Sequence, residues 1–165
     1  MAPSAKNRQP WKFIVLEGAA KNEFTSAMCV GLEREMKRIT PLPKSGFGLP
    51  DAKNTLRIME EAPVVIAVLN TNGKSPFLPV DNDARISEIC DSLSIGAAIQ
   101  NMILRAQELG LGTLWIANTC FAYEELTECL GTEVQLVSAV ALGYPDEAPG
   151  MRSRKKIGEI LEFRG

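Results

Sequence analysis

The stretch from Leu93 to Leu104 is apolar on nearly every side, and it constrains the fold more than any other part of the chain. It lies within residues 83–110, whose two ends show the amphipathic pattern of a helix. A helix that is apolar all round has to be covered on most of its sides. Its small residues, such as Gly96, would let another backbone approach closely. The sequence therefore predicts a long buried helix, either at an interface between two copies of the chain, which we favour, or at the centre of a single chain's core.

Strand and helix patterns are mixed along the rest of the chain. Two successive strand patterns at the C-terminal end leave room for antiparallel pairing, and no Gly-x-Gly-x-x-Gly or Walker loop follows a strand. These features favour an α+β fold, with a mostly antiparallel central sheet flanked by helices, over a doubly wound parallel sheet. The expected strands are 11–17, 63–69, 112–116, 134–143 and 157–163, and the other expected helices are 20–39, 51–61 and 123–130. Residues 40–51 hold many glycines and prolines and are predicted to form a long loop.

Size and charge limit the classes of partner. A chain of 165 residues with 45% hydrophobic residues predicts one domain over residues 1–165. Its net charge is −2, and no run of Lys or Arg is long enough to indicate nucleic-acid binding. Its apolar runs are much shorter than the roughly 20 residues of a membrane-spanning helix, and the N-terminus has no secretory signal pattern. We therefore expect a cytoplasmic protein whose partners are small molecules, with no membrane or nucleic-acid partner.

Histidine is absent from the sequence. This excludes Ser-His-Asp and Cys-His nucleophilic catalysis, histidine general bases and most transition-metal sites. The four cysteines form no Cys-x-x-Cys pair, so neither a zinc site nor a thioredoxin-like motif is indicated. If the protein is an enzyme, a cofactor is expected to carry its chemistry.

Two polar segments lie near the ends of the chain. Residues 3–9 run directly into the first predicted strand, and Ser4, Asn7 and Gln9 offer groups that donate and accept hydrogen bonds. Near the C-terminus, Arg152 and Arg154 would point to the same side of an extended chain and could hold a phosphate. Judged on residue types alone, the first segment could be a simple capped loop and the second a solvated basic tail.

A third segment follows the long helix. Gly112–Ile116 reads as a strand that ends in a polar loop after Trp115, Ile116 and Ala117. Backbone N–H groups at such a strand end can donate to a ring nitrogen without any particular side chain. Taken alone, the segment is merely a strand that follows a helix.

Together these segments resemble the nitroreductase family. Pro3-Ser4-x-x-Asn7-x-Gln9-Pro10-Trp11-x-Phe13 is similar to the family's flavin loop. The run Ser94 to Asn101, followed by Gly110-Leu111-Gly112-Thr113-x-Trp115-Ile116, is similar to its central helix and next strand. Gly143-Tyr144-Pro145 with Arg152-x-Arg154-Lys155 is similar to its closing segment.

The resemblance implies a homodimer with FMN in two pockets at the subunit interface, reduced by NAD(P)H. Ser4, Asn7 and Gln9 would contact the ribityl chain and ring edge, from the subunit opposite the one that holds the phosphate. Arg152 and Arg154 would hold that phosphate, and Ile116 and Ala117 would lie beside the flavin N5. The cofactor-binding residues implied by the resemblance are Pro3, Ser4, Asn7, Gln9, Trp115, Ile116, Ala117, Arg152 and Arg154. No side chain is implied as an acid or base catalyst.

The sequence departs from the family pattern in two places. Members usually carry an Arg-rich segment and a helix before the flavin loop, whereas Met1 here stands just ahead of it, so we expect an N-terminally shortened domain. Ala117 stands where the family often has Gly. Two functions stay open: an oxidoreductase that passes electrons from NAD(P)H through FMN to a nitroaromatic or quinone, or a shortened, non-catalytic protein or gene fragment that binds FMN weakly. Residues 40–51 and 71–80 are the loops expected to select the acceptor.

Overall fold

The computed structural model describes residues 1–38 and 48–165. At its centre is a four-stranded sheet in the order β1-β2-β4-β3, with every neighbouring pair antiparallel. The strands are β1 (Trp11–Glu17), β2 (Val64–Asn70), β3 (Gly112–Ile116) and β4 (Gln135–Gly143). The predicted α+β class and antiparallel sheet are confirmed.

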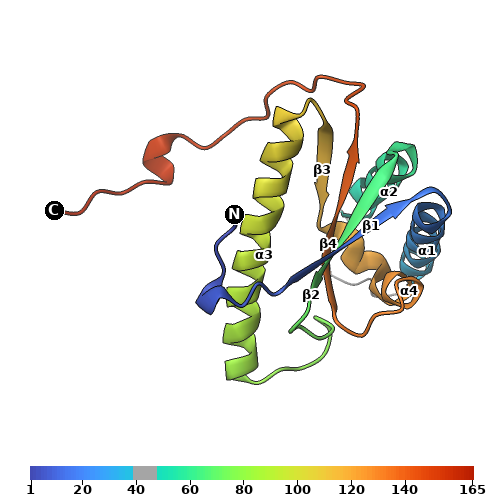
Figure 1. The fold of residues 1–165 in the computed structure, drawn as a ribbon, viewed down its shortest axis with the longest axis horizontal. Helices are drawn as coiled ribbons and strands as arrows, with labels where there is room; N and C mark the ends of the chain where they lie inside the picture. Colours follow the sequence, from blue (N-terminus) through green and yellow to red (C-terminus); the bar gives the residue numbers. More distant parts are fainter. Residues whose placement is uncertain (39–47) are drawn as a thin grey trace.

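Helices cover both faces of this sheet and make three layers (Figure 1). One face packs against α1 (Gly18–Met36), α2 (Gly48–Glu61) and α4 (Tyr123–Cys129), and the other packs against α3 (Asn82–Glu108). Short 3₁₀ helices occupy Ala5–Asn7 (η1), Asn118–Ala122 (η2) and Ile157–Glu159 (η3). Each face has its own hydrophobic core. Strand β2 is paired on both edges and covered on both faces, which agrees with its apolar sequence from Val64 to Leu69.

The long helix α3 is buried on only one side within a single chain. Ile95 and Ile99 are fully buried against the sheet. On the outer side, Ile86 is 61% exposed and Leu93 is 72% exposed. The alternative of a helix at the centre of a single chain's core is therefore wrong, since this helix has an uncovered apolar face.

Two predicted elements differ from the structure. Residues 157–163 form no strand: after η3 the segment has no regular structure, and its side chains are exposed. A strand needs a neighbour for its backbone groups, and this segment runs away from the sheet (Figure 1). Helix α2 begins at Gly48 rather than Asp51, because Pro50 falls in its first turn, where a helix tolerates proline. The rest of the predicted loop, residues 40–47, lies outside the described residues.

Nothing in the described part of the chain resembles a membrane span, since none of its helices is both long enough and apolar enough to cross a bilayer.

An ion pair ties α1 to α4 at the edge of the larger core. The Arg34 guanidinium donates to both carboxylate oxygens of Glu125, at 2.5 and 3.0 Å. The same guanidinium also contacts the buried carboxylate of Glu35 at 3.1 Å. The hydrogen bonds from Arg34 hold the pKa of Glu125 below the ordinary value of 4.5, although partial burial opposes this shift. The pair therefore stabilises the folded chain while Glu125 is ionised.

This pair predicts a pH-dependent effect of Glu125→Gln. Because the folded-state pKa is lowered, the stabilisation is complete above the unfolded-state pKa and is lost as the pH falls through the folded-state pKa. The substitution should lower the free energy of unfolding by on the order of 1 kcal/mol at neutral pH, and by less below about pH 4. Denaturant unfolding at both pH values checks this, with the exposed Glu128→Gln as the control. An equal loss at both pH values would contradict the prediction.

Candidate functional site

The segment before β1 has an unusual backbone. Lys6, Asn7 and Gln9 have φ angles of 52°, 55° and 49°, and none of them is glycine. Side chains of L-residues make this left-handed region unfavourable, at a cost of about 1–3 kcal/mol per residue. Such strain persists only where the surrounding structure holds it, and it gathers at ligand sites. The segment is therefore a candidate binding element on geometric grounds.

Hydrogen bonds within the segment close it into a tight turn. The Ser4 carbonyl accepts from the backbone N–H of Asn7 at 3.0 Å, and the Ser4 hydroxyl accepts from that of Gln9 at 3.1 Å. The Gln9 side-chain amide donates to the Asn7 side-chain carbonyl at 3.3 Å. Three predicted site residues are thus brought together. Ser4 serves in the turn itself, and Pro3 lies directly before it.

A hollow of about 780 Å³ lies between this turn and α3. Asn7, Gln9 and Trp11 form one wall, with amide groups and an indole ring. The volume is within the usual range for small-molecule sites, and the mixture of apolar surface with a few amides is typical of them. The remaining lining residues are Met1, Ala2, Ala98, Asn101, Leu104, Arg105 and Glu108.

The contribution of α3 to this hollow was missed in the sequence. Ala98, Asn101 and Arg105 follow one another at helical spacing and lie on the same side of α3. Asn101 follows Gln100 as the second of two adjacent amide residues within the mostly apolar run from Leu93 to Leu104, and this was the available signal. Arg105 forms an exposed ion pair with Glu108 at 2.9 Å, at the rim of the hollow.

The end of β3 lies near α3 but does not line the hollow. Trp115 is 44% exposed, and its indole N–H donates to the Ser138 hydroxyl at 3.3 Å. A Cβ added at Gly96 would stand 3.7 Å from the Trp115 ring, an ordinary contact distance, so the ring lies directly beside this part of the helix. Ile116 is buried in the opposite core, which leaves only its backbone for a ligand. Ala117 is exposed at the start of η2.

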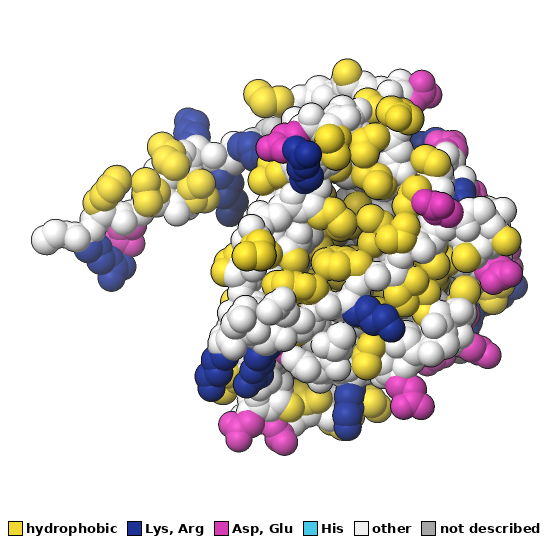
Figure 2. Space-filling model, in the orientation of Figure 1, with side chains coloured by type: hydrophobic (Ala, Val, Ile, Leu, Met, Phe, Trp, Pro, Cys, Tyr) yellow, Lys and Arg dark blue, Asp and Glu magenta, His cyan; other side chains and the backbone are white. Residues whose placement is uncertain are grey.

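The two predicted phosphate ligands are not brought to the hollow in a single chain. Arg152 and Arg154 are exposed in the segment after β4, which leaves the body of the molecule beyond α3 (Figure 1). Hydrophobic side chains are also spread along this segment (Figure 2). Ile157, Ile160 and Phe163 are among them, and each is more than half exposed.

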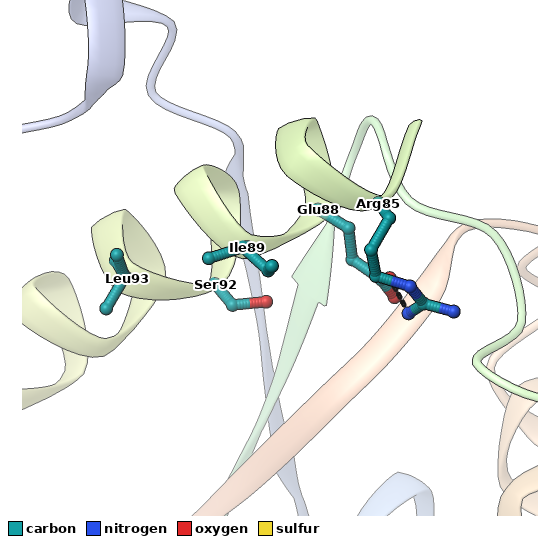
Figure 3. Close-up of a pocket in the computed structure, with 5 residues that line it drawn as sticks. All are labelled: Arg85, Glu88, Ile89, Ser92 and Leu93. Carbon is teal, nitrogen blue, oxygen red and sulfur yellow. Dashed lines mark hydrogen bonds and ion pairs between the residues drawn. The ribbon is translucent and has the colours of Figure 1, made fainter. Parts of the chain in front are cut away.

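Among the described residues, no group of three or more cysteine and carboxylate side chains is placed to hold a metal ion. A second, smaller hollow of about 380 Å³ lies over the first turns of α3, along Arg85, Glu88, Ile89, Ser92 and Leu93 (Figure 3).

Comparison with known proteins identifies the family. The model of the family described as "Nitroreductase family" matches residues 1–144. The chain belongs to the nitroreductase family. A relative from Archaeoglobus fulgidus, named "Putative NADH dehydrogenase/NAD(P)H nitroreductase", is 30% identical over 154 residues, which are 89% of this chain and 68% of that protein.

Solved nitroreductase structures share the fold. A nitroreductase-like family protein from Bacillus cereus superimposes with a TM-score of 0.68 at 22% identity, over 98% of this chain and 77% of that one. The FMN-dependent nitroreductase NfnB of Mycobacterium smegmatis, solved with NADPH, gives a TM-score of 0.66 at 17% identity, over 99% and 82% of the two chains. The family match ends at residue 144, so Arg152 and Arg154 lie beyond it.

The strained turn predicts an unusual response to glycine. Lys6→Gly should be more stable than Lys6→Ala by about 1 kcal/mol, because only glycine adopts a positive φ without steric cost. Lys12 in β1 is also exposed, and there the order should reverse, since glycine weakens a strand. Denaturant unfolding of the four variants measures both differences. An alanine variant at position 6 as stable as the glycine variant would show that the turn is unstrained.

Proposed function

We propose that this protein is an FMN-dependent oxidoreductase that passes electrons from NAD(P)H through bound flavin to a small-molecule acceptor such as a nitroaromatic or a quinone. The observation that carries the proposal is the hollow between the strained turn and α3. Membership of the nitroreductase family and the likeness to an FMN-dependent nitroreductase solved with NADPH support it.

The residues around the hollow suit a flavin. Asn7, Gln9 and Asn101 carry side-chain amides, which both donate and accept and so match ring carbonyls, ring nitrogens and ribityl hydroxyls. Trp11 and Leu104 supply apolar surface for a flat ring. Flavin, when bound, supplies the hydride-accepting and electron-donating chemistry, and the protein supplies binding and orientation. This division suits a chain that has no histidine.

Each part of the chain then has a defined task. The strained turn would present Asn7 and Gln9 at fixed positions, so that little order has to be gained on binding. Ile116 and Ala117 would contribute backbone N–H groups at the end of β3. Arg152 and Arg154 would bind the phosphate, and Pro3 and Trp115 would complete the site.

We further propose that the working form is a homodimer. The outer side of α3 carries a stripe of exposed apolar side chains that a second copy would cover: Ile86, Ile89 and Leu93. Isolated exposed apolar residues are ordinary, but a continuous stripe indicates an interface. A dimer would also allow Arg152 and Arg154 of one copy to reach a site that includes the turn of the other.

Flavin binding tests the proposed function directly. The purified protein should bind FMN, and anaerobic NADH or NADPH should bleach the visible absorbance of the bound flavin. A folded, colourless protein would favour the alternative, a non-catalytic protein with the family fold that binds FMN weakly.

A comparison of FMN with riboflavin distinguishes the residues proposed to bind the phosphate from those proposed to bind the rest of the flavin. Arg152→Ala and Arg154→Ala should each weaken FMN binding by about tenfold or more, because a charge-assisted contact is lost. Neither should change riboflavin binding, since riboflavin has no phosphate. Asn7→Ala and Gln9→Ala should weaken both ligands, and Lys155→Ala is the control for charge alone. Equal loss of riboflavin in the arginine variants would contradict the phosphate role.

Leu93→Glu tests the dimer. A carboxylate on the exposed apolar stripe cannot be buried without a partner charge, so the variant should become monomeric. Light scattering measures the mass, and the matched control is Val30→Glu, an exposed apolar residue on α1, on the other face of the sheet. A parent protein that is already monomeric at micromolar concentration would contradict the dimer.

A further inference from the structure

The strained turn is tied to the body of the protein at both of its ends. At the first end, the Ala5 backbone N–H donates to the Ser94 hydroxyl on α3 at 3.2 Å, across 89 residues of sequence. At the second end, the Pro10 carbonyl accepts from Thr71, from the backbone N–H at 2.8 Å and the hydroxyl at 3.2 Å. Thr71 directly follows β2, at the start of residues 71–81, which connect β2 to α3. The strained turn and the start of this connection are therefore held against each other.

A buried carboxylate lies next to the second tie. Asn72, next to Thr71, donates its side-chain amide to Asp91 on α3 at 3.1 Å. Asp91 is only 2% exposed. Its other oxygen, Oδ1, is buried without a hydrogen-bond partner in the described part of the chain. A buried carboxylate with one unsatisfied oxygen destabilises a fold compared with an apolar residue of similar size. Stability therefore does not explain Asp91, whereas a role in fixing the position of Asn72 does.

Further contacts hold the same turn after β2. The Asn70 side-chain amide donates to the Gln135 side chain at 3.1 Å, and Gln135 in turn donates to Glu88 on α3 at 2.7 Å. A Cβ added at Gly73 would stand 2.4 Å from the Gln135 side-chain oxygen, so a larger residue there would displace the Gln135 side chain. Glu88 also pairs with Arg85 (Figure 3). These contacts hold the residues on both sides of Asn72, and Asp91 is the residue of α3 that Asn72 itself contacts.

One turn of α3 thus carries both anchors. Asp91 and Ser94 are three residues apart and lie on the same side of the helix. Ser94 donates to the Cys90 carbonyl at 2.8 Å, which orients its oxygen toward Ala5. Helix α3 therefore does two things at the hollow. It lines one side with Asn101 and Arg105, and through Ser94 it contacts the strained turn that forms the opposite wall.

We propose that Asp91 is a positioning residue of the cofactor site: through Asn72 and Thr71 it fixes the Pro10 carbonyl and so holds Asn7 and Gln9 in their strained conformation. The proposal rests on the proposed function for the identity of the ligand. The anchoring of the turn can be measured without any ligand.

A reciprocal exchange tests the contact. In Asn72→Asp the new carboxylate faces that of Asp91, so the hydrogen bond is replaced by repulsion. Adding Asp91→Asn restores a hydrogen bond between an amide and a carboxylate, with the two groups exchanged. Asn82→Asp, an exposed change at the start of α3, is the control for the gain of one negative charge.

The first readout is trypsin cleavage of the FMN-free protein after Lys6 and Arg8, which lie in the turn. Cleavage should be about tenfold faster in Asn72→Asp, should return to within about threefold of the parent in the exchanged pair, and should not change in Asn82→Asp. Cleavage after Lys53, within α2, reports global unfolding and should stay constant. Unchanged cleavage at the turn, or faster cleavage that the exchange does not reverse, would overturn the proposal.

The second readout is FMN affinity, which should fall about tenfold in Asn72→Asp and recover in the exchanged pair. Faster cleavage with unchanged FMN affinity would overturn the positioning role. A parent protein that binds no FMN would overturn the proposed function instead, and the cleavage rates would still decide whether Asp91 anchors the turn.

Discussion

The pairing of β2 with both of its neighbours is the interaction on which the rest of the structure depends. Seven register pairs join it to β1, and its pairing with β4 runs along its whole length with one irregularity, at Val68 and Leu69. All of its backbone groups are therefore used within the sheet, and its side chains can be apolar on both faces. The two hydrophobic cores lie against these faces, so both helical layers take their positions from this strand.

The candidate site follows from how the two ends of β1 and β2 meet. β1 begins where β2 ends, because Trp11 is paired with Asn70. The turn before β1 and the turn after β2 therefore lie together, and the Pro10 and Thr71 contact joins them. Helix α3 crosses this side of the sheet and closes the hollow. The turn before β1 is the strained one, and its contacts with the end of β2 and with α3 hold it in that conformation.

Much of the fold could be predicted from residue patterns. Periodicity located the four strands that form, because each buries apolar residues on at least one face of the sheet. It failed for residues 157–163, whose pattern is that of a strand but whose backbone has no neighbouring strand among the residues that the structure describes. It also predicts too late a start for α2, since prolines and glycines near residue 50 are typical of loops. Pro50 is in the one part of a helix that tolerates it.

The candidate site was predicted only in part. Asn7 and Gln9 were found because their segment resembles a family motif, and the structure places both at the hollow. Asn101 and Arg105 were missed, since a helix pattern does not say which of its polar residues face a cavity. The places of Arg152 and Arg154 relative to the hollow stay a prediction that depends on a second copy of the chain.

The sequence by itself determined which segments form helices and strands, the absence of histidine chemistry and the family to which the chain belongs. These depend on local patterns and residue types, which are readable in order along the chain. Only the tertiary structure decided that α3 leaves an apolar face uncovered, that the turn before β1 is strained and that Asp91 and Ser94 hold it. The physical reason is that burial and strain depend on contacts between residues far apart in sequence, such as Ala5 and Ser94, and no local pattern specifies which distant residue will supply the partner.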